Sequence, residues 1–182
     1  GLVMAFHIGR IVKLVCPDYT AIVCWRQFFC QSFGIANIII WVFKVLVTFI
    51  VTEFTAWFNH KYLMHGPLWI LHKDHHKKDH KSWFERNDLF FFFYAFLSIT
   101  FVVLWGQGFW LGLPIAIGIG MYGLAYFIVH DIFIHQRFRI FRNIDNKYAR
   151  GVRRAHKIHH KNIDKHGGEC FGMLIVPKKY FK

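Results

Sequence analysis

A long run of the chain, from Leu89 to Val129, contains no Asp, Glu, Lys, Arg or His. About 20 apolar residues cross the hydrocarbon core of a bilayer, so this run predicts two membrane-spanning helices, at 89–105 and 108–129. The sequence Trp105-Gly106-Gln107-Gly108, where the two ranges meet, supplies the break, because glycines interrupt helices. The chain is therefore expected to cross the membrane and return to the side from which it entered.

A third span is expected at 35–58, where the only charged residues are Lys44 and Glu53. Residues 1–34 are a fourth, weaker candidate, because charged residues interrupt them; a transmembrane helix and an interfacial or re-entrant helix both fit. A composition of 55% hydrophobic and 20% aromatic residues excludes a disordered basic tail. We expect an all-α integral membrane protein, a single domain over 1–182 with about four transmembrane or membrane-embedded helices.

The net charge of +13 is concentrated in the two His-rich regions, at 59–88 and 130–182, which flank the predicted spans. Both regions are expected on one side of the membrane, and the excess of Lys and Arg makes that side cytoplasmic. They would form a helical cap over the spans. Nucleic-acid binding is not expected, because the spacing of the common DNA-binding motifs is missing. The lack of a Ser- and Arg-rich transit peptide favours a bacterial cytoplasmic membrane.

Ten of the 13 histidines form a pattern that occurs twice. Each copy is HxxxxH followed by HxxHH, and the two copies differ only in the distance between these motifs. The first copy consists of His60, His65, His72, His75 and His76, and the second of His130, His135, His156, His159 and His160. A duplicated pattern with fixed spacing favours metal ligands over ten separate surface histidines.

The spacing of the histidines constrains where their rings point. On an α-helix the offsets 0, 3 and 4 fall at about 0°, 300° and 40°, so the three rings of HxxHH lie within an arc of about 100°. The HxxxxH offset of five gives about 140°, so those two rings can share one ion only if the helix has a local bulge. This geometry suits two metal ions better than one, with the division of the ligands left open.

Ten neutral imidazoles on two ions give about five ligands each, which leaves a position for oxygen or water. Imidazole suits iron, zinc, copper and nickel, and zinc prefers four ligands. Two non-haem irons are therefore favoured, with zinc as a substitute that a crystal can contain. A metal store or a pH sensor is the non-enzymatic alternative. Carboxylates are expected to orient the imidazoles, and the candidates are Glu53, Asp74 and Asp131.

A GxGxxG sequence at 118–123 lies inside the predicted span 108–129. A nucleotide site needs this motif between a strand and a helix, so here it indicates close packing of membrane helices. The chain also lacks clustered cysteines that could hold an iron–sulfur centre. Electrons are therefore expected from a partner protein.

These motifs resemble those of the histidine-rich membrane β-carotene hydroxylases of the fatty acid hydroxylase/sterol desaturase superfamily. The resemblance covers about 35–182. It rests on His60-Lys-Tyr-Leu-Met-His65, His72-Lys-Asp-His75-His76, Phe84-Glu-Arg-Asn-Asp-Leu-Phe90, His130-Asp-Ile-Phe-Ile-His135, His156-Lys-Ile-His159-His160 and Gly168-Glu-Cys-Phe-Gly-Met-Leu174.

The resemblance implies an iron-dependent monooxygenase that uses O2 and electrons from ferredoxin and its reductase. Its reaction would hydroxylate the β-ionone rings of β-carotene at C3 and C3′, giving β-cryptoxanthin and zeaxanthin. A membrane-dissolved polyene suits an aromatic wall, for which the candidates are Phe90, Phe91, Phe92, Phe93 and Tyr94. The alternative enzyme is a fatty acid or sterol hydroxylase or desaturase with the same metal site.

Overall fold

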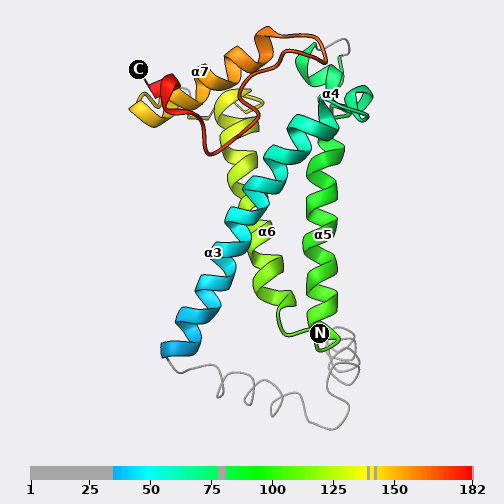
Figure 1. Ribbon diagram of the computed structural model, residues 1–182, viewed down its shortest axis with the longest axis vertical. Coiled ribbons are helices and arrows are strands. Elements are labelled where there is room, and N and C mark those ends of the chain that lie inside the picture. The colour runs from blue at the N-terminus through cyan, green and yellow to red at the C-terminus, as the bar shows by residue number, and fades with distance from the viewer. Residues whose placement is uncertain (1–34, 78–80, 139, 142, 182) are drawn as a thin grey trace, which may run out of the picture.

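The computed structural model describes residues 35–77, 81–138, 140–141 and 143–181, and the candidate segment at 1–34 lies outside this part of the chain. The described part contains helices and loops without a β-strand, as expected for an all-α protein (Figure 1). Its elements are α3 (Ile35–Phe58), the π-helix η1 (Asn59–Met64), α4 (Trp69–His76), α5 (Asp88–Gly106), α6 (Gly112–Tyr126), the π-helix η2 (Phe127–Ile134), α7 (Lys147–Lys161) and the 3-10 helix η3 (Lys178–Phe181).

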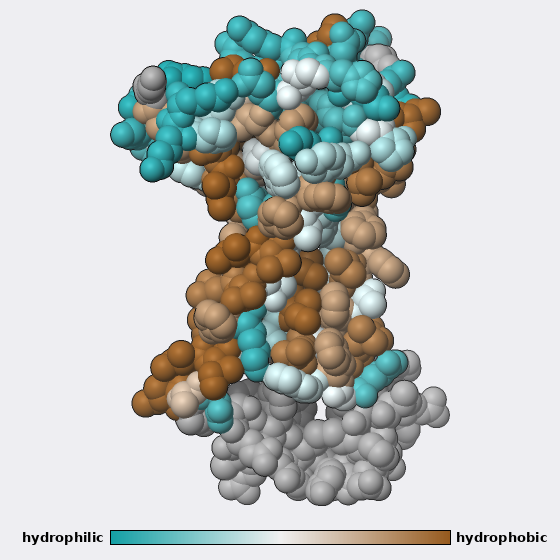
Figure 2. Space-filling model, viewed as in Figure 1, coloured by the Kyte–Doolittle hydropathy of each residue, from teal (hydrophilic) through white to brown (hydrophobic). Residues whose placement is uncertain are grey.

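Three helices of the described part are long and apolar enough to cross a membrane, at 35–64, 88–106 and 112–134. None of the residues of α5 is buried in the protein, and apolar side chains cover the spans below a hydrophilic cap (Figure 2). Such a surface is stable when lipid covers it. The helix α6 begins at Gly112, after the expected start at 108, because Gly108 has a φ of +99° and forms part of the turn.

The helix α6 packs against both α3 and α5. A Cβ atom on Gly118 would lie 2.6 Å from the Cβ of Thr48 in α3, and one on Gly112 would lie 2.8 Å from the Cβ of Trp105 in α5. Glycine is therefore required at both contacts. The Ser98 hydroxyl donates to the Ala116 carbonyl at 2.9 Å and adds a polar link between α5 and α6. Close helix packing, as expected, accounts for Gly118 of the GxGxxG sequence.

The cap consists of α4, α7 and the C-terminal segment at one end of the spans (Figure 1). The helix α7 begins where the Asn146 side chain accepts a hydrogen bond from the Ala149 N–H at 2.8 Å, a common N-terminal cap. Its apolar face packs on Val176 and Tyr180 of the C-terminal segment. The same buried face carries His156 and His159, so the packing that holds α7 on the cap also turns these rings inward.

Candidate metal centre

The structure brings the ten histidines of the duplicated pattern together in two groups. Cluster 1 comprises His60, His65, His72, His76 and His159. Cluster 2 comprises His75, His135, His156 and His160, joined by His130, whose Nε2 lies 3.0 Å from the Nε2 of His75. In cluster 1, and in cluster 2 apart from His130, one nitrogen per residue lies within 4.8 Å of all the others.

Each cluster contains four histidines from one copy of the pattern and one from the other copy. The exchanged residues are His75 and His159, the middle histidines of the two HxxHH motifs. On α4 the rings of His72 and His76 are about 40° apart, while His75 lies about 60° to the other side of His72. The helix therefore directs two rings to cluster 1 and one to cluster 2.

Each HxxxxH motif begins in a π-helix that continues the span from α3 or α6, and its second histidine, His65 or His135, is the C-cap of that helix. The His65 N–H donates to the His60 carbonyl at 3.1 Å, and the His135 N–H donates to the His130 carbonyl at 2.9 Å. A π-helix repeats its hydrogen bond every five residues, so residues five apart lie on the same face. The local bulge that the HxxxxH spacing required is therefore a π-helix in each copy.

Four backbone carbonyls of one segment bind the Nδ1 atoms of cluster 1. This segment, residues 162–171, is named the strap. The distances are 2.8 Å from His76 to Asn162, 3.0 Å from His65 to Lys165, 2.9 Å from His159 to Glu169 and 2.9 Å from His60 to Phe171. A carbonyl oxygen only accepts, so each of these Nδ1 atoms carries a proton and each neutral ring presents its Nε2 lone pair.

Side chains of the turn before α5 orient two more rings. The Nδ1 of His72 lies 2.7 Å from Asn87 Oδ1, and the Nδ1 of His75 lies 2.9 Å from Glu85 Oε2. Arg137 binds this Glu85 oxygen at 3.0 Å and holds the turn in place. The sequence pattern did not identify Glu85 and Asn87 as partners of the rings, because they lie between the two copies. The motif Phe84–Phe90 was the only indication of them.

The three expected carboxylate candidates have different surroundings. Asp131 Oδ2 lies 3.5 Å from the Nδ1 of His130, at the edge of hydrogen-bonding distance. Asp74 accepts a hydrogen bond from the Arg86 N–H at 2.8 Å, so it fastens the turn that carries Glu85 and Asn87. Glu53 accepts hydrogen bonds from the backbone beyond the strap.

The Nε2 atoms within each cluster face one another at short distances. They are 3.1 Å apart in His60–His72 and His72–His76, 3.4 Å in His65–His159, and 2.8 Å in His135–His156. Two nitrogens that bind one ion at right angles, each at about 2.1 Å, lie about 3.0 Å apart. The observed separations therefore fit ligands of a shared cation.

Protonation does not explain these short distances. Burial lowers the pKa of His72 to about 2, of His159 to about 3 and of His76 to about 4. The rings are therefore neutral near pH 7, and their facing lone pairs repel unless a cation lies between them. The donor set, neutral nitrogens with oriented Nδ1 atoms, suits a transition metal.

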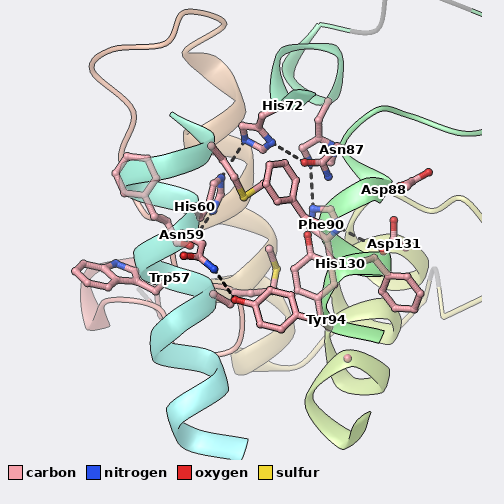
Figure 3. A pocket seen from close by; sticks show the side chains of 18 of the residues that line it. Trp57, Asn59, His60, His72, Asn87, Asp88, Phe90, Tyr94, His130 and Asp131 are labelled. Atoms are coloured by element: carbon pink, nitrogen blue, oxygen red, sulfur yellow. Dashed lines mark hydrogen bonds and ion pairs between the residues drawn. The ribbon is translucent and has the colours of Figure 1, made fainter. Parts of the chain in front are cut away.

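A cavity of about 60 Å³ lies on the membrane side of the clusters, where α3, α5 and α6 meet. Histidines of both clusters line it, among them His60, His72 and His130 (Figure 3). Its other lining residues include six aromatic side chains: Trp57, Phe90, Phe91, Tyr94, Tyr122 and Tyr126. The arrangement places an apolar, aromatic chamber directly beside both candidate metal sites.

Three of the five candidate substrate-lining aromatics, Phe90, Phe91 and Tyr94, line this cavity. Phe92 and Phe93 are not among the lining residues, and they are 53% and 54% exposed. The Tyr94 hydroxyl accepts a hydrogen bond from Asn59 Nδ2 at 2.8 Å (Figure 3). This contact joins α5 to the π-helix that carries His60.

Comparisons with known proteins agree with this arrangement. The chain is 39% identical over 142 residues to a beta-carotene hydroxylase of Pantoea ananas, covering 76% of this chain and 80% of that protein. It is 39% identical to a beta-carotene hydroxylase of Paracoccus sp. over 73% of this chain and 82% of the relative. A chloroplastic beta-carotene 3-hydroxylase of Arabidopsis thaliana is 35% identical over 70% of this chain and 42% of the longer plant protein.

No solved structure shows a significant match to the chain. The sequence profile of the fatty acid hydroxylase family matches residues 45–177, a range that includes all ten histidines, both π-helices and the strap. The chain therefore belongs to the fatty acid hydroxylase family.

Proposed function

We propose that this chain is a membrane non-haem di-iron monooxygenase that hydroxylates the β-ionone rings of β-carotene at C3 and C3′, forming β-cryptoxanthin and then zeaxanthin. The observation that carries the proposal is the aromatic cavity bordered by histidines of both clusters. A hydrocarbon substrate offers no polar group for recognition, so its reacting ring must be held by shape and apolar contact. The similarity to bacterial beta-carotene hydroxylases supports this substrate.

Clusters 1 and 2 would each hold one iron through five imidazoles. Bound iron would supply the activation of O2 for insertion of an oxygen atom into a ring C–H bond. The strap carbonyls, Asn87 and Glu85 keep the protons on Nδ1, so that the Nε2 atoms remain available. Phe90, Phe91 and Tyr94 would pack against the ring and keep water from the reacting carbon.

The electron donor would be a ferredoxin-type protein, with the His-rich cap on the cytoplasmic side of a bacterial inner membrane. The excess of Lys and Arg in the cap supports this orientation. Exposed lysines of the cap lie next to the histidines in the chain: Lys73 and Lys77 in and directly after α4, and Lys157 and Lys161 in α7. An acidic donor on this surface would approach both clusters.

The test is expression in bacterial cells that accumulate β-carotene, with chromatography of the pigments and metal analysis of the purified protein. The wild-type chain should yield monohydroxylated and then dihydroxylated products and contain two irons. His159→Ala should lower iron content and products together. Hydroxylated or desaturated fatty acids or sterols with unchanged β-carotene would refute the proposed substrate. Bound metal without O2 consumption in the presence of reduced ferredoxin would refute the enzymatic function.

A further inference from the structure

Glu53 joins the first span to the segment that follows the strap. It lies in α3, is buried, and its Oε1 accepts hydrogen bonds from the N–H groups of Leu174 at 3.1 Å and Ile175 at 3.0 Å. Only residues 172 and 173 lie between this attachment and the end of the strap. A buried carboxylate oxygen is costly unless hydrogen bonds satisfy it, and the two N–H groups satisfy Oε1, so the pairing fixes the chain at this point.

The strap has no regular secondary structure to hold its shape. Its four carbonyls nevertheless meet four ring nitrogens at 2.8–3.0 Å. The α7 helix fixes the N-terminal end of the strap, because Asn162 follows its last residue. The opposite end, at Phe171, depends on what holds residues 172–175.

The strap serves one cluster rather than both. Four of the five Nδ1 atoms of cluster 1 bind strap carbonyls, and the fifth, that of His72, binds Asn87. In cluster 2, the Nδ1 of His75 binds Glu85 instead. Displacement of the strap would therefore remove hydrogen-bond partners from the rings of cluster 1.

We propose that Glu53 is a positioning residue for cluster 1: by holding Leu174 and Ile175 it keeps the strap carbonyls on the Nδ1 atoms of His60, His65, His76 and His159. This inference rests on the proposed two-metal function. It assigns a role to the Gly168–Leu174 motif, whose backbone rather than its side chains would orient the ligands. It also explains a buried acidic residue within a membrane span.

The experiment measures bound metal per chain in detergent-purified full-length protein loaded with Co²⁺. Two ligand-depleted backgrounds assign each ion: His72→Ala with His76→Ala removes cluster 1, and His156→Ala with His160→Ala removes cluster 2. Each background should bind one ion. Glu53→Leu should lower the wild-type ratio from two to one, the cluster-2-depleted background from one to zero, and leave the cluster-1-depleted background at one.

Matched variants separate positioning from general damage. Glu53→Gln keeps an oxygen that accepts both N–H groups, so it should retain two ions. Asp164→Asn changes an exposed carboxylate in the strap and should also retain two. If Glu53→Leu does not fold, Gly172→Ala decides, because its Cβ would lie within contact of the Ile175 carbonyl and displace the same turn; it should lose the cluster 1 ion alone.

The outcomes distinguish this inference from the proposed function. A wild-type chain that binds no metal would refute the two-metal centre itself. A wild-type chain that binds two ions, with a folded Glu53→Leu variant that also binds two, would refute the role of Glu53 alone. Loss of the cluster 2 ion, or equal loss of both ions from a folded variant, would also refute it.

Discussion

Replacement of Glu85 by Gln tests whether the partner of a ring nitrogen sets the affinity of cluster 2. Glu85 Oε2 lies 2.9 Å from the Nδ1 of His75, and the two side chains are 11% and 3% exposed. A hydrogen bond to a charged group contributes about 1.5–3 kcal/mol and a neutral one about 0.5–1.5 kcal/mol. The Gln variant keeps the geometry and loses the charge, so the expected cost is about 1–1.5 kcal/mol. Since about 1.4 kcal/mol is tenfold, the affinity should fall roughly five- to twelvefold.

Arg137 places the expected value at the lower end of this range. Its guanidinium lies 3.0 Å from the same Glu85 oxygen and 2.8 Å from Asp88, so part of the carboxylate charge is already neutralised. Glu85→Ala, which leaves no acceptor, should cost about 10- to 100-fold, as other losses of a ligand's hydrogen-bond partner do. Asp88→Asn is the control, because Asp88 contacts Arg137 and accepts the Glu85 N–H without contacting His75. Asn keeps an oxygen for that N–H, so the effect should stay below about twofold on the same grounds.

The assay is a Co²⁺ titration against a competing chelator, in the background that lacks the cluster 1 ligands His72 and His76. In that background only cluster 2 binds, so the measured constant belongs to the site that Glu85 serves. An unchanged constant for Glu85→Gln would refute the reasoning. So would an effect of Glu85→Gln on the intact chain that disappears in this background, because the change would then act through cluster 1.

Three further perturbations test the cavity, the strap and the buried rings. Gly123 lines the cavity, and a Cβ at this position would meet no atom within 4 Å. Gly123→Leu should therefore fill the chamber and cut carotenoid product at least about tenfold with metal content unchanged. Phe93→Leu should preserve product, and equal products from both variants would contradict the cavity's role. Cys170 has a φ of +57°, so Cys170→Val should destabilise the protein by about 1–2 kcal/mol and Cys170→Gly should not, as thermal unfolding in detergent can check. The pKa of His72 is lowered to about 2 and that of His76 to about 4 in the folded chain, against about 6.5 in the unfolded chain. Between these values the unfolded chain binds more protons than the folded chain, so stability and retained metal should fall together from pH 7.5 to 5.5. A flat pH profile would contradict this reasoning.

The membrane spans could be predicted because they depend on local composition. Apolar length and missing charge identify 35–58 and 89–105 without knowledge of tertiary contacts. The start of α6 was harder to predict, because the backbone conformation at Gly108 places this residue in the turn and the helix begins only at Gly112. Segment boundaries depend on such local dihedral angles, which apolar runs do not encode.

The spacing of the histidines also contains information about the local helix geometry. An offset of five that must serve one site required a bulge, and the π-helices at 59–64 and 127–134 provide it. The angular positions of the three HxxHH rings around a helix already separated the middle histidine from its neighbours. The exchange of His75 and His159 between clusters also depends on how α4 and α7 pack, so the division of the ligands required the structure.

The partners of the ring nitrogens were much harder to predict. The strap acts through backbone carbonyls, which every residue possesses, so no residue type marks Lys165 or Glu169 as an acceptor. Glu85 and Asn87 have side chains that can accept a hydrogen bond, but their distance from the rings depends on how the turn before α5 folds against α4. Such contacts are set by tertiary structure rather than by sequence spacing.

The exchange of one histidine between the two copies has a consequence for assembly. Cluster 1 needs His159 from α7 in addition to four rings from η1 and α4, and cluster 2 needs His75 from α4 in addition to rings from η2 and α7. Under the proposed two-metal function, neither half of the chain could complete a five-ligand site alone. The first span, the α5–α6 pair and the cap would have to be docked before either ion gained its full ligand set. Metal binding would therefore be coupled to the packing of the whole cap.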